Sequence, residues 1–203
     1  MAKSKPALRD KYSGPPKLTN AINDKLGKDR VIFVQHCSDL FADEVPTPLI
    51  IAVLSRCADY PQNRYLFHTK YPRRMLDLWR DNAVVKPTNV MFGVTLETDV
   101  YPTADISNAP PPAERIQALL EHKALLHGRL MISIEPIMAF SNVVGFAEKI
   151  RKLNPVFISI GADSKGGKLV EPCKHDLHGF IAFCKEHGIE IKEKKNLGRL
   201  LER

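Results

Sequence analysis

A short apolar segment followed at once by polar residues recurs six times along this chain, and this recurrence constrains the fold most. In the first case, VIFVQHCSDLF, the apolar run at residues 31–34 gives way to the polar residues HCSD at 36–39. A run of this length is typical of a strand that is buried in a parallel sheet and ends in a polar mouth. The later runs cover residues 64–67, 89–94, 130–134, 156–160 and 189–191.

The stretches between these runs have the spacing of amphipathic helices. Over residues 49–57 the apolar side chains recur at three- and four-residue steps, and Thr47 with Pro48 predicts the start of this helix. Pro72 opens the next helix, with the sequence PRRMLDLWR. Further helices are predicted over residues 113–128 (with Ile116, Leu119, Leu120 and Leu125 on the buried side), 141–153 (capped by Ser141 or Asn142) and 175–187.

Strands and helices that alternate every ~25 to 40 residues indicate repeated βα units. We therefore predict an α/β fold, a partial (β/α)6 TIM-like barrel of parallel strands. An open doubly wound sheet is the alternative, because periodicity does not distinguish an open sheet from a curved one. Residues 1–30 are polar and interrupted by proline and glycine, so we predict that they form an N-terminal arm. We predict that residues 31–203 form a single barrel domain.

The amino-acid composition limits the binding partners and the cellular compartment that we expect for this protein. A formal net charge of +7 favours acidic partners, with nucleic acid or phosphate first among them. The four cysteines contain no CxxC pair, so the spacing provides no zinc ribbon, redox dithiol or three-cysteine cluster loop. No signal-like segment opens the chain and no apolar run is long enough to cross a bilayer, so we expect a cytoplasmic protein with free thiols and no membrane partner.

Polar side chains follow the strands at the edge where parallel α/β sheets bind ligands. The candidate binding residues are Ser38, Asp39, Lys70, Thr95, Glu97 and Glu135. This set suits a small zwitterionic ligand with hydroxyl groups, because a carboxylate holds an ammonium group, a lysine holds a carboxylate, and Ser or Thr bonds a ribose. The alternatives are helix caps, loop contacts, or salt bridges from Asp39 and Glu135 to Arg64, Arg73 or Arg129.

Three further features leave alternatives open. His36 and His68 end two strands and could act as acid, base or ligand, while His36 also fits a hydrogen-bonded core histidine. Lys70 with Arg73 and Arg74 could instead form a solvated basic face. The proline-rich passage 101–112 predicts a lid or binding segment. There is no GxGxxG after a strand, no Walker loop, no HExxH and no GxSxG.

Five passages, IFVQHCSDLFADEVP, PQNRYLFHTKYPRRM, NVMFGVTLETD, RLMISIEPIM and VFISIGADSKG, occur in this order between residues 31 and 166. Together they resemble the phage-associated radical SAM-like proteins that are distantly related to spore photoproduct lyase. The resemblance implies a partial (β/α)6 barrel that binds S-adenosylmethionine at its strand ends. It implies that Ser38 and Asp39 receive the methionyl ammonium group, and that Lys70, Thr95, Glu97 and Glu135 contact the carboxylate and ribose.

The sequence departs from this family in one respect. The family's barrel begins with a strand and a loop whose three cysteines hold a [4Fe–4S] cluster, and nothing before Val31 has that loop. Cys37 alone does not replace three thiolates. The expectation is therefore a fragment or split gene whose cluster is supplied by another chain, or a barrel that keeps only the fold.

Two further functions fit the same sequence. A binding module without catalysis, for nucleic acid or a phosphorylated ligand, is favoured by the net charge and the basic C-terminal segment 192–203. An aldolase- or transglycosylase-like barrel would use Lys70 as an amine nucleophile or Glu135 as a base.

Overall fold

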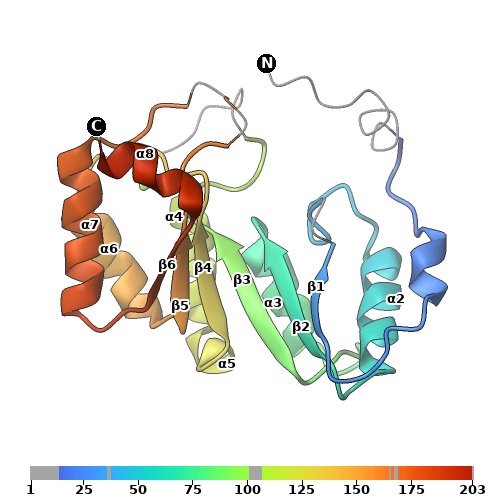
Figure 1. Cartoon of the computed structure of the whole chain (residues 1–203). Coiled ribbons are helices and arrows are strands. Elements are labelled where there is room, and N and C mark those ends of the chain that lie inside the picture. The colour runs from blue at the N-terminus through green and yellow to red at the C-terminus, as the bar shows by residue number, and fades with distance from the viewer. Residues whose placement is uncertain (1–13, 36–37, 101–106, 165, 167–168, 203) are drawn as a thin grey trace.

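A computed structural model describes residues 14–35, 38–100, 107–164, 166 and 169–202 (Figure 1). Its six strands form one parallel sheet whose spatial order is the chain order, β1-β2-β3-β4-β5-β6. The strands are β1 (Val31–Val34), β2 (Arg64–Thr69), β3 (Val90–Thr95), β4 (Leu130–Ile134), β5 (Phe157–Ile160) and β6 (Ile191–Glu193). All six predicted strands are therefore confirmed, with ends that shift by up to two residues.

The helices are η1 (Asn20–Asn23), α2 (Thr47–Ala58), α3 (Pro72–Arg80), α4 (Pro112–Glu121), α5 (Lys123–Leu126), α6 (Val143–Leu153), α7 (Lys174–Glu186), η2 (Lys195–Leu197) and α8 (Gly198–Leu201). Helices α2 to α7 lie between successive strands, η1 precedes β1, and η2 and α8 follow β6. Helix α3 packs against α4, α4 against α6, and α6 against α7. Helices α3, α4, α6 and α7 therefore form one continuous layer beside the sheet.

The two faces of the sheet differ in burial. Side chains of a strand point alternately to the two faces of the sheet. The face that packs against the helices carries Phe67, Phe92 and Ile132, which are 0–1% exposed. On the other face, Phe33 of β1 is 45% exposed and Leu66 of β2 is only partly buried. A doubly wound sheet reverses its strand order at a switch point and carries helices on both faces. The described strands keep the chain order without a reversal, with β1 and β6 as open edges. The α/β prediction of parallel strands that alternate with helices is confirmed, and the unreversed strand order is the feature that favours the partial barrel.

Several local predictions need correction. The helix predicted over residues 113–128 breaks at His122, which separates α4 from α5. Leu120 is 36% exposed and does not belong to the buried face, because Leu119 takes the core-facing position. The N-cap of α2 is Pro46, one residue before the predicted Thr47. Asn142, one of the two predicted caps, does cap α6, since its side chain accepts a hydrogen bond from the backbone N–H of Gly145 at 2.8 Å.

In the part of the chain that the structure describes, no helix has the length and apolar character to cross a bilayer.

Candidate functional site

A cavity of about 230 Å³ lies at the carboxyl ends of β1, β2 and β3. These strand ends form the upper edge of the sheet in Figure 1. Its lining residues are Phe33, Gln35, Ser38, Asp39, His68, Thr69, Lys70 and Thr95. Four of the six predicted site residues therefore meet around one cavity, namely Ser38, Asp39, Lys70 and Thr95. We call this cavity the mouth. His36 and Cys37, which follow β1 in the sequence, lie outside the described residues.

Asp39 joins the loop after β1 to the end of β2. Its Oδ1 accepts hydrogen bonds from the hydroxyl of Thr69 at 2.7 Å and from the backbone N–H of Phe41 at 3.0 Å. Its Oδ2 accepts a third from the backbone N–H of Lys70 at 2.7 Å. Because an ionised carboxylate has about four acceptor positions, this geometry leaves one for a ligand. The first role of Asp39 is thus to hold the loop after β1 against the end of β2. We call these two segments the rim of the mouth.

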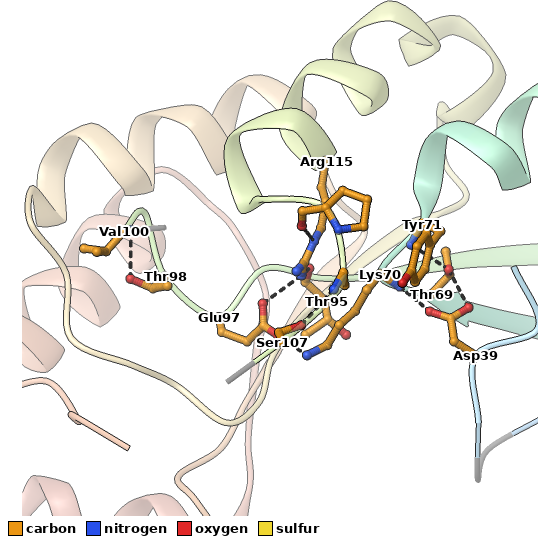
Figure 2. A network of polar contacts seen from close by, with 12 residues as sticks. Asp39, Thr69, Lys70, Tyr71, Thr95, Glu97, Thr98, Val100, Ser107 and Arg115 are labelled. Carbon is orange, nitrogen blue, oxygen red and sulfur yellow. Dashed lines mark hydrogen bonds and ion pairs between the residues drawn. The ribbon is translucent and has the colours of Figure 1, made fainter. Parts of the chain in front are cut away.

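Lys70, Glu97 and Arg115 form a buried charge network beside the mouth, and Figure 2 shows Lys70 and Arg115 converging on Glu97 from opposite sides. Arg115 Nη1 donates to Glu97 Oε2 at 2.8 Å and to the carbonyl oxygen of Thr95 at 2.8 Å. The ammonium group of Lys70 pairs with the other carboxylate oxygen, Oε1. The side chains of Arg115 and Glu97 are 0% and 7% exposed, whereas that of Lys70 is 34% exposed and remains accessible.

Glu97 is ionised in this setting. Burial pushes its pKa upward, but Arg115 and Lys70 outweigh burial, and the pKa lies below its usual value. The network holds two cations and one carboxylate, and the ammonium group of Lys70 is its accessible cation. An anionic ligand group in the mouth would meet this ammonium group.

His68 lies on the floor of the mouth and is neutral at neutral pH. Burial lowers its pKa, with Lys70 acting in the same direction and Asp39 opposing. Its Nε2 lies 2.9 Å from the hydroxyl oxygen of Thr95, and its ring lies 5.8 Å from that of Phe33. Gly93 makes room for it, since a Cβ there would lie 3.0 Å from the ring atom Cδ2 of His68.

Glu135, at the end of β4, belongs to a second cluster along the same edge. Its carboxylate lies 3.7 Å from the ammonium group of Lys194, which follows β6. Both close around Gly161, where an added Cβ would lie 3.0 Å from Lys194 Cγ and 3.2 Å from the carboxyl carbon of Glu135. Asn196 donates to the carbonyl oxygen of Ala162 at 2.7 Å. Glu135 does not line the mouth.

The predicted salt bridges to arginine do not occur in the described part of the chain. Asp39 is held by a hydroxyl and two backbone N–H groups, Glu135 pairs with Lys194, and Arg73 pairs with Glu121 at 2.8 Å. Lys70 points to Glu97 rather than joining Arg73 on a basic face. Of the proline-rich passage proposed as a lid, residues 101–106 lie outside the described residues.

The sequence analysis missed Arg115. Its signal was nonetheless present, because Arg115 shares one helical stripe with Leu119 and lies next to Ile116, where an apolar residue is expected. A cation on the buried side of a helix needs an anion across the interface. Glu97, which the sequence analysis predicted to bind a ligand, is the anion that pairs with Arg115.

The described cysteines do not form a ligand set for an iron–sulfur cluster. Cys57 is on α2 and Cys184 on α7, Cys173 caps α7 at its exposed start, and all three are free thiols. Among the described residues, no group of three or more His, Cys, Asp or Glu side chains is arranged to hold a metal. These residues do not fit the cluster of the family that the sequence resembles, and we derive no chemical step through it.

The cysteines yield a prediction about reactivity. Burial raises the pKa of the Cys57 and Cys184 thiols to about 12. Because the thiolate is the reactive form, iodoacetamide at pH 8 is expected to alkylate exposed Cys173 well before either of them. Peptide mapping by mass spectrometry over time measures this, and urea-unfolded protein, in which all three react alike, is the control. Equal rates in the folded protein would contradict the burial of both thiols.

Comparison with known proteins gives one match. A family model described as "Protein of unknown function (DUF5131)" matches residues 5–149. No curated protein and no solved structure matches the chain. The matched region contains Ser38, Asp39, Lys70, Thr95, Glu97 and Glu135, and it ends within α6. Since it covers well over half of the chain, the chain belongs to the DUF5131 family.

Proposed function

We propose that the mouth binds the amino-acid end of S-adenosylmethionine, in a barrel of the radical SAM type. The observation that carries the proposal is the meeting of one carboxylate, one accessible ammonium group and three hydroxyls around a single cavity. These are the side chains of Asp39, Lys70, Ser38, Thr69 and Thr95. They are complementary to a ligand that carries an ammonium group, a carboxylate and hydroxyls.

Each group has a stated role in this proposal. Lys70, already held by Glu97, bonds the ligand carboxylate. The remaining acceptor position of Asp39 and the exposed hydroxyl of Ser38 receive the ligand ammonium group. The mouth, at about 230 Å³, is smaller than the roughly 300–1,000 Å³ of typical ligand pockets. The nucleoside therefore extends along the strand ends toward Glu135.

Calorimetric titration with S-adenosylmethionine, methionine and adenosine tests the proposal. Lys70→Met is expected to weaken S-adenosylmethionine binding by about tenfold or more, since it removes a charge-assisted hydrogen bond. Adenosine, which has no carboxylate, should respond little to this substitution. Lys149→Met, on the exposed side of α6, is the matched control and should leave binding unchanged. Absence of heat at millimolar S-adenosylmethionine, or equal affinities for both variants, would refute the proposal.

The cluster belongs to a separate part of the proposal, a partner chain that supplies the [4Fe–4S] ligands. Anaerobic reconstitution of this chain alone with iron and sulfide is expected to yield neither cluster absorbance nor 5′-deoxyadenosine. A stoichiometric cluster on the isolated chain would overturn the need for a partner and leave ligand binding in the mouth intact.

A second candidate function is binding of nucleic acid or a phosphorylated ligand, favoured by the net charge of +7. A salt titration of DNA and RNA binding measures it, because neutralised phosphates give a steep dependence on ionic strength. Affinity that is near zero and flat with salt would exclude this function.

A further inference from the structure

The proposed ligand contacts leave the imidazole of His68 without a role, although it belongs to the mouth. His68 lies on β2 and lines the cavity together with Asp39 and Lys70. In the register of the sheet it pairs with Gly93 of β3. Among the side chains that line the mouth, the imidazole is the one whose charge changes closest to neutral pH.

One edge of the imidazole ring is held against β3. Nε2 lies 2.9 Å from Thr95 Oγ1, and the neighbouring ring atom Cδ2 lies 3.0 Å from where a Cβ at Gly93 would be. The ring centroid lies 5.8 Å from that of Phe33. Nδ1 is on the opposite edge of the ring and forms no hydrogen bond with any residue that the structure describes. Nδ1 is therefore the ring nitrogen that is available to a ligand in the mouth.

The contact with Thr95 allows Nδ1 to be a hydrogen-bond acceptor. A neutral imidazole carries its proton on one nitrogen, and the other nitrogen keeps a lone pair. Because a hydroxyl group donates or accepts, Thr95 Oγ1 can accept a hydrogen bond from the N–H at Nε2, which leaves the lone pair on Nδ1. A ligand ammonium group only donates hydrogen bonds, so it selects this tautomer of His68.

The neutral state of His68 follows from its surroundings. The charged groups that act on it are Asp39 after β1, Lys70 after β2, Glu97 after β3 and Lys194 after β6. Burial lowers the pKa of His68 below its ordinary value of 6.5, and the two lysines act in the same direction, whereas the two carboxylates oppose them. The imidazole is therefore neutral at pH 7 and becomes a cation in acid.

We infer that His68 makes the mouth selective for a cationic ligand group. Its Nδ1 accepts a hydrogen bond from the ammonium group that Asp39 also holds, and protonation of His68 turns the same position into a cation that repels this group. The inference rests on the proposed function, because the ammonium group is that of the amino-acid end of S-adenosylmethionine. A ligand whose carboxylate faced the imidazole would show the opposite dependence on pH, since a protonated imidazole attracts an anion.

Calorimetry with L-methionine between pH 7 and pH 4.5 tests the inference, because the ammonium and carboxylate groups of this probe stay ionised over that range. Wild-type affinity is expected to fall by about tenfold as His68 changes from neutral to protonated. His68→Gln cannot be protonated and should lack this loss. The matched control is His178→Gln, at an exposed position on α7, which should keep the loss. The desamino analogue of methionine, which has no ammonium group, should bind the wild-type protein without it.

A second measurement uses the wild-type protein alone. The NMR signal of the C–H group at Cε1 of His68 reports its protonation, and the absence of this signal in His68→Gln assigns it. Saturating L-methionine should lower the pH at which His68 is half protonated by about one pH unit, because a tenfold coupling acts equally on both equilibria.

The contrary results separate this inference from the proposed function. If methionine binds with the same pH profile in wild type and His68→Gln, or if bound methionine does not displace the titration of His68, the role of His68 is overturned and the proposed function stands. Affinity that rises in acid only where His68 is present places the ligand carboxylate at the imidazole and also overturns the inference. Absence of methionine and S-adenosylmethionine binding at millimolar concentration refutes the proposed function, and the inference falls with it.

Discussion

Replacing Glu97 with Ala is expected to destabilise the protein by about 3–5 kcal/mol, the largest effect among the substitutions considered. The substitution leaves the guanidinium of Arg115 buried, with its ion-pair partner gone. It also releases Lys70 from its partner at the mouth. For a domain of this size the loss corresponds to a melting temperature lower by roughly 6–20 °C, measurable by circular dichroism.

The double variant Glu97→Leu/Arg115→Met is the control for this explanation. It removes both buried charges and fills the space with apolar groups, so it is expected to recover much of the lost stability. If the double variant is as unstable as Glu97→Ala, lost packing rather than an uncompensated charge causes the effect.

The same carboxylate makes stability depend on acid. Because the folded-state pKa of Glu97 is lowered, the folded protein binds its proton less readily than the unfolded chain does. Its contribution is therefore fully present above the usual pKa of 4.5 and is lost as the pH falls through the folded-state value. Urea unfolding between pH 7 and pH 3 should show wild type and Glu97→Gln converging at the acid end. A constant difference across this range would contradict the pairing.

Replacing Asp39 with Ala is expected to cost about 2–4 kcal/mol, because it removes an ionised acceptor of three hydrogen bonds. It leaves the backbone N–H of Lys70 without its acceptor and frees the loop after β1 from the end of β2. Urea unfolding measures the loss, and limited proteolysis of the loop between β1 and α2 reports its release. The neighbouring Ser38→Ala is the matched control, since Ser38 is exposed and its hydroxyl accepts a hydrogen bond from the Gln35 side chain. Equal stability of the two variants would show that Asp39 does not fix the rim.

The sequence predicted the strands well because their signal is local. The segment LMISI has all five residues buried in β4, so nothing in its neighbourhood competes with the strand pattern. The helix after it was also predictable, because Asn142 can satisfy a free N–H of the first turn from its own side chain. The break at His122 was not predictable, since the side chain bonds the carbonyl oxygen of Ala118 and the chain turns within an unbroken apolar pattern.

For the site, the residue types at the strand ends were predictable and their partners were not. The sequence placed Asp39 and Lys70 at one edge of a parallel sheet, which the structure bears out. It could not show that Lys70 would pair with Glu97, or that Glu97 would pair with a helical arginine 18 positions later in the chain. Pairing of this kind depends on distances between elements, and no local pattern encodes them.

The sequence by itself determined the α/β class, because apolar runs alternate with amphipathic segments and the burial of strands and helices follows local periodicity. The same pattern determined the edge of the sheet at which polar side chains gather. Only the tertiary structure decided that the strand order never reverses, since helices on one face or on both give the same linear pattern. Only the tertiary structure also decided which charged side chains pair with other groups of the protein and so stabilise the fold. Asp39 holds the loop after β1 to the end of β2, and Glu97 pairs with Arg115 and Lys70, because ion pairs form between whichever side chains packing brings within reach.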